Sequence, residues 1–432
     1  MRTNIPCLVL KFLSSFLKSR VDDMRFSISD FRFSILHTLH ICNRMSNIGY
    51  QNNLNGTRLT TGACFLSCPQ MVLMQINAEP FIFTGMKIGF LYYKFFPVEG
   101  GAAIHGYHLA RELSLLGYDL YKLNGEKDPY TKKLNNPVTG FLWMLARCDL
   151  IYARMDYFLK PRNLLVVLAL LFRKRVFVEL NAPSDELYLY GRTPAYIRRV
   201  DRIMAHILKR ADTIVVVSEP LKLYCTQALR LKNVAVVENG ADRFEMKPGD
   251  VSKEIIEQLN RIKTRWPKLV VWPGSTNKMQ NLEDLKNLAR KAQEKAAFLI
   301  IAKEEPGEHL QDMDEPNVYV WKGLARAEVE YIIKEADIGI ALYEDYHWSR
   351  WGFYNSSLKT FEYLSNGLLT ISNKKGTGIQ QKNPNFRFAG NPDEMLTFMD
   401  EEPTDTGTDH SYRTWKHVAS DISNLIHRSE TA

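Results

Sequence analysis

The sequence has few cysteines and no long apolar run, and both features narrow the class of protein. Its 432 residues include six cysteines, and the one close pair, Cys64 and Cys68, has no second pair downstream at a zinc-site spacing. So few cysteines favour a reducing compartment and give no support to a structural metal site. The apolar run at residues 164–172 is too short to span a bilayer and is followed at once by three basic residues.

An excess of acidic residues is also absent. The chain holds 56 Lys and Arg against 48 Asp and Glu, a net charge of +8, and residues 1–85 account for eight of the basic and four of the acidic residues. No basic run is interleaved with aromatic residues, so we expect no nucleic-acid partner. The mild basicity, with the basic residues after position 172, is compatible with peripheral contact with an anionic membrane.

Residues 1–85 differ in pattern from the rest. They contain scattered short apolar pieces, and those near residues 8–17 are interrupted by Lys11 and lack a small-residue cleavage site, which argues against a secretory signal. Met86 stands immediately before a regular strand pattern. We therefore expect residues 1–85 to be an atypical leader, either disordered or a mis-assigned start. The expected location is the cytoplasm, either in solution or peripherally at the inner membrane face.

After Met86, short apolar runs alternate with amphipathic helical stretches, a pattern typical of parallel α/β sheets. The first series of runs lies at residues 87–92, 150–152, 176–178 and 213–217, and the second at 269–272, 298–301, 317–320, 338–341 and 368–371. We predict two doubly wound halves, residues 86–245 and 246–405. Because such sheets bind ligands at the carboxyl ends of their strands, we predict the site in a cleft between the halves.

Residues 355–367 are the most informative segment. Residues 355–357, Asn-Ser-Ser, suit the N-cap of a helix that Gly367 ends. The free N–H groups and positive dipole end of such a helix can bind a diphosphate. Lys359 can add a charge, and Glu362, one turn on, can accept hydrogen bonds from paired sugar hydroxyls. The other interpretation is an ordinary capped surface helix with a Lys/Glu pair.

Blocks of sequence along the chain, taken in order and spacing, resemble a known family. They lie at residues 100–105, 149–154, 178–183, 211–219, 237–242, 336–338 and 359–367. They resemble the retaining glycosyltransferases of family 4, which have the GT-B fold, and the resemblance covers nearly everything after Met86. It implies an acceptor domain at 86–245, a donor-nucleotide domain at 246–405, and a C-terminal helix within 406–432 that crosses back to the first domain.

The resemblance also implies roles for individual residues. Donor binding is implied for Gly100, Gly101, Gly274, Lys278, Asn355, Ser356, Ser357, Leu358, Lys359 and Glu362. Catalytic roles are implied for His105, Lys359 and Glu362, and acceptor contacts for His105 and Asn181. The alternatives are a strand-to-helix turn for the first two glycines, a satisfied structural histidine at His105, and a solvated loop lysine at Lys278. Asn239 and Gly240 are expected to shape the interdomain turn rather than perform chemistry.

The sequence departs from the family pattern at several positions. Tyr354 occupies the place of the first glutamate of the family's paired-glutamate motif. A group that orients the donor sugar is therefore missing there, or comes from Glu344, Asp345 or His347. Asn181 stands where many relatives have a histidine, and an amide cannot transfer a proton at neutral pH.

The activity that the resemblance implies is transfer of a sugar, with retained anomeric configuration, from a nucleoside diphosphate sugar to an acceptor hydroxyl. A glycan or lipid-linked acceptor is expected, in bacterial-type polysaccharide or glycolipid synthesis. No Asp-x-Asp element stands where it would support manganese, so we expect neither metal nor cofactor, and the helix start with Lys359 would stabilise the leaving diphosphate. The alternatives are a nucleotide-sugar epimerase of similar fold and a catalytically weak sugar-nucleotide-binding protein.

Overall fold

The computed structural model describes residues 85–92, 98, 100–123, 125–157, 161–246, 249–275, 277–302, 315–405 and 412–429. These residues belong to one compact unit, Asn77–Ala432. The expectations for the leader therefore lie outside the described residues, apart from Gly85.

The first half is built on a seven-stranded parallel sheet with strand order β3-β2-β1-β4-β5-β6-β7. Its strands are β1 (Lys87–Leu91), β2 (Asp119–Lys122), β3 (Thr131–Lys133), β4 (Leu150–Met155), β5 (Val176–Leu180), β6 (Thr213–Val216) and β7 (Val234–Val236). Every residue of β5 is buried, as expected for a strand covered by helices on both faces. The order of the first six strands is that of a doubly wound sheet.

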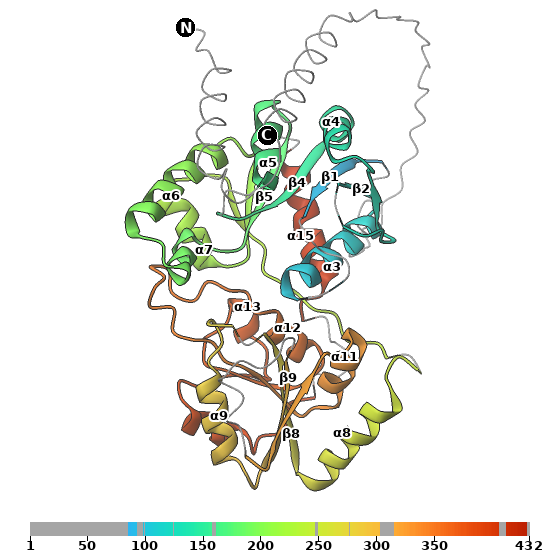
Figure 1. Cartoon of the computed structure of the whole chain (residues 1–432), viewed down its shortest axis with the longest axis vertical. Helices are drawn as coiled ribbons and strands as arrows, with labels where there is room; N and C mark the ends of the chain where they lie inside the picture. Colours follow the sequence, from blue (N-terminus) through green and yellow to red (C-terminus); the bar gives the residue numbers. More distant parts are fainter. Residues whose placement is uncertain are drawn as a thin grey trace, which may run out of the picture. The chain divides into compact units, whose positions relative to one another are not determined.

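Helices cover both faces of this sheet. One core cluster contains residues of α3 (Gly101–Leu115) and of α15 (Trp415–Arg428), the last helix of the chain. These two helices lie side by side (Figure 1). The other cluster contains residues of α4 (Pro137–Arg147), α5 (Pro161–Leu171), α6 (Pro194–Leu208), α7 (Glu219–Leu223), the 3-10 helix η1 (Ser184–Tyr190) and the π-helix η2 (Tyr224–Ala228).

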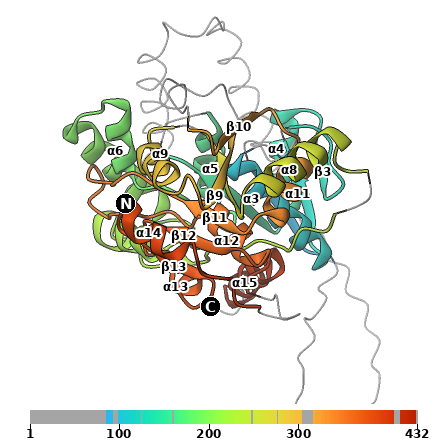
Figure 2. The ribbon, with the colours of Figure 1, turned by 90° about the horizontal axis from the view of Figure 1, so that it is seen from below.

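The second half is a six-stranded parallel sheet with order β10-β9-β8-β11-β12-β13. Its strands are β8 (Lys268–Gly274), β9 (Ala296–Ala302), β10 (Val318–Lys322), β11 (Ile338–Ala341), β12 (Leu369–Ser372) and β13 (Phe386–Phe388). Residues of α8 (Lys253–Arg265), α11 (Arg326–Glu335) and α12 (Leu358–Ser365) fill one core cluster, and those of α9 (Leu282–Lys291) and α14 (Pro392–Phe398) fill the other. Helix α14 lies beside α9, and α13 (Gly378–Gln381) precedes β13 (Figure 2).

The segment between β11 and α12 contributes to the core of the first half. We call residues 346–354 the aromatic segment. Tyr346 and Tyr354 belong to the cluster that α4 to α7 cover, and Trp348, Trp351 and Phe353 pack against it. In the same segment, the guanidinium of Arg350 donates to the fully buried carboxylate of Asp185 at 2.6 and 3.1 Å. Part of the second half therefore completes the core of the first.

The predicted fold class, with two doubly wound parallel sheets, is confirmed. Each of the nine predicted apolar runs corresponds to a strand, with bounds shifted by a few residues. Sequence analysis missed β2, β3, β7 and β13, which have three or four residues each and too few apolar positions to show a period. Among the described residues, no helix combines the length and the apolarity needed to cross a bilayer.

Candidate functional site

The start of α12 presents unused backbone donors. Ser357 is the N-cap, and its side chain accepts a hydrogen bond from the Thr360 N–H at 3.3 Å. The N–H groups of Leu358 and Lys359 donate to no acceptor in the described part of the chain. Because these groups lie at the positive end of the helix dipole, the start of α12 can bind an anion.

Lys359 is enclosed at the carboxyl end of β8. Its Nζ donates to Gln280 Oε1 at 2.6 Å and lies 4.2 Å from the centroid of the Trp272 ring. A Cβ atom on Gly274 would stand 2.9 Å from this Nζ, so the glycine makes room for the lysine. Burial lowers the pKa of Lys359 from its ordinary 10.5 to about 7, and Glu362 opposes the shift only in part. A bound diphosphate would therefore favour uptake of a proton here.

Glu362 is buried and forms an ion pair with Arg326 at the start of α11. Arg326 also donates to Glu330 at 2.7 Å, so one guanidinium bridges two carboxylates. Burial, and then the charges of Arg111 and Arg326, lower the pKa of His108 from its ordinary 6.5 to about 3. Sequence analysis missed Arg326 and His108, since neither lies in a block that resembles the family.

The glycine loop of the first half lies against the start of α12. Gly100, the N-cap residue of α3, has φ of 79°, a conformation that favours glycine. A Cβ atom on Gly101 would stand 3.3 Å from Leu358 Cδ1. The loop and the helix start therefore meet.

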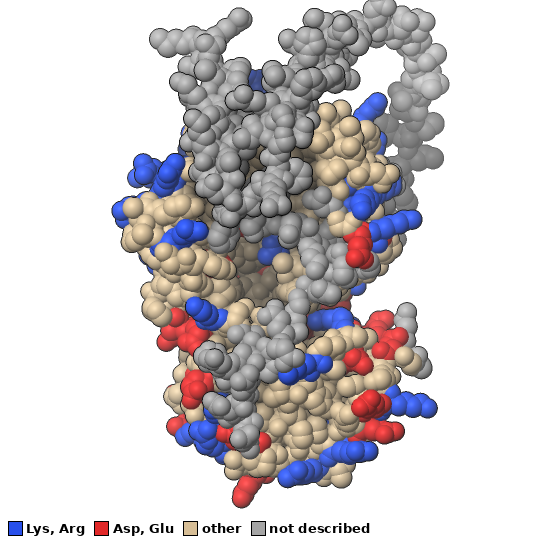
Figure 3. All heavy atoms as spheres, in the orientation of Figure 1, with Lys and Arg blue, Asp and Glu red and all other residues tan. Residues whose placement is uncertain are grey.

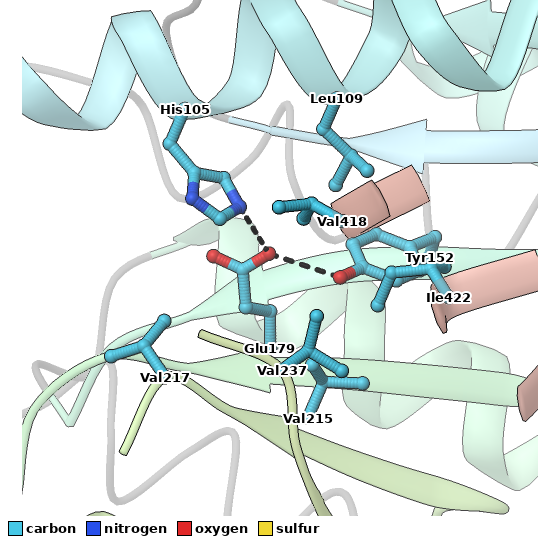
Figure 4. Close-up of a pocket in the computed structure, with 9 residues that line it drawn as sticks. All are labelled: His105, Leu109, Tyr152, Glu179, Val215, Val217, Val237, Val418 and Ile422. Atoms are coloured by element: carbon cyan, nitrogen blue, oxygen red, sulfur yellow. Dashed lines mark hydrogen bonds and ion pairs between the residues drawn. The ribbon is translucent and has the colours of Figure 1, made fainter. Parts of the chain in front are cut away.

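His105 belongs to a buried polar cluster (Figure 4). Its Nε2 lies 3.1 Å from Glu179 Oε2, and its Nδ1 lies 2.7 Å from Asn239 Oδ1. Tyr152 donates to Glu179 Oε2 at 3.0 Å, and Asn181 Nδ2 donates to Glu179 Oε1 at 2.6 Å. His105 and Asn181, the two predicted acceptor-binding residues, thus share Glu179 as a partner.

Glu179 is the hub of this cluster and is 1% exposed. Burial acts to raise the pKa of its carboxyl group, but His105, Arg154 and hydrogen bonds outweigh burial and hold that pKa well below its usual range. Glu179 is therefore an ionised, fully engaged carboxylate, which sequence analysis did not single out.

A small space lies behind the His105–Glu179 pair (Figure 4). It leaves no room for a water molecule, and its remaining walls are mostly Val, Leu and Ile side chains of the sheet, α3 and α15. Ligand pockets usually measure roughly 300–1,000 Å³. We interpret this space as a packing gap of the core and not as a ligand site.

Tyr354 lies in the core of the first half. Its ring is 1% exposed, its carbonyl oxygen accepts a hydrogen bond from Ser218 Oγ at 2.6 Å, and its hydroxyl donates to Glu186 Oε2 at 3.1 Å. Burial raises the pKa of Glu186, although hydrogen bonds from Tyr157 and Tyr354 oppose the shift. Glu186, from the other half, is a nearby carboxylate that sequence analysis missed. The three suggested substitutes, Glu344, Asp345 and His347, have exposed side chains.

The structure gathers most of the predicted residues around the start of α12. Those near it are Gly100, Gly101, Gly274, Asn355, Ser356, Ser357, Leu358, Lys359 and Glu362, with His105 linked through Asn239. Lys278 is exposed and has no ion pair among the described residues. No group of three or more His, Cys, Asp or Glu side chains that could hold a metal ion occurs in the described part of the chain. The roles of these residues stay predictions.

Comparisons with known proteins agree on the fold. The sequence matches no protein-family profile and no curated protein sequence. A glycosyltransferase from Rickettsia africae ESF-5 superposes with a TM-score of 0.52 and 13% identity, over 81% of this chain and 97% of that one. AviGT4, a glycosyltransferase of avilamycin A biosynthesis, superposes with a TM-score of 0.53 and 11% identity, over 81% of this chain and 99% of that one.

A third similar structure is Anabaena Alr3699/HepE in complex with UDP and glucose. It gives a TM-score of 0.51 and 14% identity, over 80% of this chain and 98% of that one. Identities this low establish the fold alone. The chain has the GT-B fold of these glycosyltransferases.

Proposed function

We propose that the protein is a retaining glycosyltransferase, of the family 4 type, that moves a sugar from a nucleoside diphosphate sugar to an acceptor hydroxyl. One observation carries the proposal. The glycine loop of one sheet touches the start of a helix of the other sheet, where unused N–H groups, Lys359 and Glu362 lie together. The acceptor would be a glycan or a lipid-linked glycan, in polysaccharide or glycolipid synthesis.

Each group at the helix start has a proposed task. The N–H groups of Leu358 and Lys359 would bind the diphosphate, and the protonated Lys359 amine would stabilise charge on the leaving group without a metal. Glu362, held by Arg326, would accept hydrogen bonds from the ribose hydroxyls. The anomeric carbon would react on the face that the diphosphate leaves, with the departing phosphate assisting deprotonation of the acceptor.

Calorimetric titration tests the donor site. Wild-type protein is titrated with UDP, GDP and ADP, and one of them is expected to bind. Glu362→Ala should lower the affinity for that nucleotide at least tenfold, because it removes the buried carboxylate that would accept hydrogen bonds from the ribose. Glu330→Ala is the matched control, since it removes the other carboxylate on Arg326 and should change the affinity less than threefold. If both substitutions lower the affinity equally, Glu362 does not contact the nucleotide. If wild-type protein binds none of the three nucleotides, the proposed function is overturned.

Product analysis separates the enzyme classes. With the matching nucleotide sugar, a transferase consumes donor only when an acceptor is present, whereas an epimerase forms an epimer without acceptor and a binding protein forms no product. NMR of the product's anomeric proton then distinguishes retention from inversion. Donor consumption that leaves a free epimer, with no acceptor in the mixture, would replace the transferase proposal.

We further propose that the protein acts in the cytoplasm and touches an anionic inner membrane face through α6. The exposed side chains of this helix include Arg198, Arg199, Arg202 and Tyr196, and its one acidic residue, Asp201, is buried. Basic side chains gather over α6 in the space-filling view (Figure 3). None of the three arginines has an ion pair with a described carboxylate, so their charges remain available to lipid phosphates.

Vesicle sedimentation tests this contact. Reversing the three arginines of α6 to glutamate should abolish binding to vesicles with anionic lipid, while zwitterionic vesicles should bind neither protein. The same reversal on α8 serves as the matched control, at Lys253, Arg261 and Arg265. Equal loss in the two triple variants would mean that net charge, and not α6, directs the contact.

A further inference from the structure

A continuous chain of buried hydrogen bonds runs from the first sheet to the start of α12. It connects Glu179 on β5 to His105 on α3, then Asn239 after β7, and then Ser356, which directly precedes the N-cap residue of α12. The Asn239 side-chain amide donates to the Ser356 carbonyl at 2.6 Å, and the Asn239 N–H donates to Ser356 Oγ at 3.0 Å. Exposed fractions of these four residues are 1%, 4%, 7% and 5%.

The network fixes the orientation of the Asn239 amide. Only the NH₂ group can donate to the Ser356 carbonyl, so the amide oxygen must face His105. His105 Nδ1 therefore donates to Asn239, while Nε2 faces the ionised carboxylate of Glu179. Both ring nitrogens are thus engaged, and in this arrangement His105 orients Asn239.

We infer that Asn239 is a positioning residue that couples the His105–Glu179 pair to the donor-binding start of α12. The inference rests on the proposed function. Ser356 lies two residues before Leu358 and three before Lys359. The N–H groups of these two residues are the proposed hydrogen-bond donors to the diphosphate, so a displacement of Ser356 also displaces them. Asn239 binds Ser356 at two points and therefore fixes both the position and the direction of the backbone there.

The chain also offers a matched comparison for this coupling. Ser218 Oγ donates to the Tyr354 carbonyl at 2.6 Å, and Ser218 is 4% exposed. This bond joins the first half to the same segment only two residues before Ser356, yet no hydrogen bond within the described part of the chain connects Ser218 to His105. Ser218→Ala therefore loosens the segment without breaking the proposed coupling.

The first measurement compares nucleotide affinity in two variants. Asn239→Asp keeps an oxygen acceptor for His105 but replaces the donor to the Ser356 carbonyl by a second oxygen, which repels it. Titration of wild-type protein with UDP, GDP and ADP first identifies the nucleotide that binds. We expect Asn239→Asp to lower the affinity for that nucleotide at least tenfold. Ser218→Ala should weaken it less than threefold, with both melting temperatures recorded to confirm folding. Equal weakening by the two variants would overturn the inference.

A double-mutant cycle provides the second measurement and does not depend on whether Asn239→Asp folds. His105→Gln and Ser356→Ala are made singly and together, and the nucleotide affinities are compared. Coupling through Asn239 predicts that the double variant differs at least threefold from the product of the single effects. Multiplicative effects would overturn the inference while leaving the proposed function intact. Failure of wild-type protein to bind any of the three nucleotides would overturn both.

Discussion

The buried amine of Lys359 makes the stability of the fold depend on pH in a calculable way. Its pKa is about 7 in the folded protein against an ordinary 10.5, so between these values the unfolded chain binds more protons than the folded chain. Burying an amine that is protonated in the unfolded chain therefore lowers the free energy of unfolding. This loss of stability is greatest below pH 7 and disappears as the pH rises toward 10.5. From the two pKa values it is about 4 kcal/mol at pH 7 and about 2 kcal/mol at pH 9.

We therefore predict that alkaline pH stabilises wild-type protein relative to Lys359→Met. Methionine fills a similar volume without a charge, so its variant lacks the penalty. The difference in unfolding free energy between the two proteins should shrink by about 2 kcal/mol from pH 7 to pH 9, an upper bound because part of the Lys359 side chain remains accessible to solvent. Urea denaturation at pH 6, 7, 8 and 9 measures it.

Lys278→Met is the control for this experiment, because Lys278 is an exposed lysine on a nearby loop. Its stability difference from wild type should stay constant over the same pH range. If the Lys359→Met difference also stays constant within about 0.5 kcal/mol, the amine is not desolvated. The proposed proton uptake on diphosphate binding would then have no basis.

Two further substitutions, Gly339→Ala and Arg350→Met, test the packing that supports the site, and Gly378→Ala is the control for the first. Gly339→Ala should destabilise the protein by about 1–3 kcal/mol in urea denaturation, because the new Cβ would stand 2.3 Å from the fully buried Tyr363 ring. In Gly378→Ala the new Cβ meets no atom within 4 Å, so this variant should lose less than about 1 kcal/mol of stability. Equal effects would mean that the sheet relaxes around the new methyl group. Arg350→Met leaves the buried Asp185 carboxylate without its guanidinium, so it should lower the free energy of unfolding by about 2 kcal/mol in the same assay. This is less than the roughly 3–5 kcal/mol lost when a fully buried pair is broken, because Arg350 is half exposed. A loss below about 0.5 kcal/mol would show that solvent replaces the pair.

Local patterns in the sequence were enough to predict nine of the strands in the described part of the chain and the start of α12. Ser357 caps the helix and Gly367 follows its end with φ of 82°, because capping and left-handed turns depend on a few neighbouring residues. The alternation of buried strands likewise needs no distant information. The prediction reached as far as these short-range rules apply.

Contacts between distant parts of the chain were not predictable in this way. Arg326 meets Glu362 across 36 positions, and Glu186 meets Tyr354 across 168, with no sequence spacing that relates them. The departure of Tyr354 from the pattern of the resembled family was visible in the sequence. Its physical reason, a ring that fills the core of the other half, required the three-dimensional packing.

The aromatic segment has a consequence for the protein as a folding unit. Tyr346 and Tyr354 come from the second half of the chain yet fill the interior of the first, so neither half is a self-sufficient module. Separating the chain near residue 245 would open a void in one piece and leave two large rings exposed to water on the other. We therefore expect the two halves to unfold together in a single cooperative transition, unlike two independent domains joined by a linker.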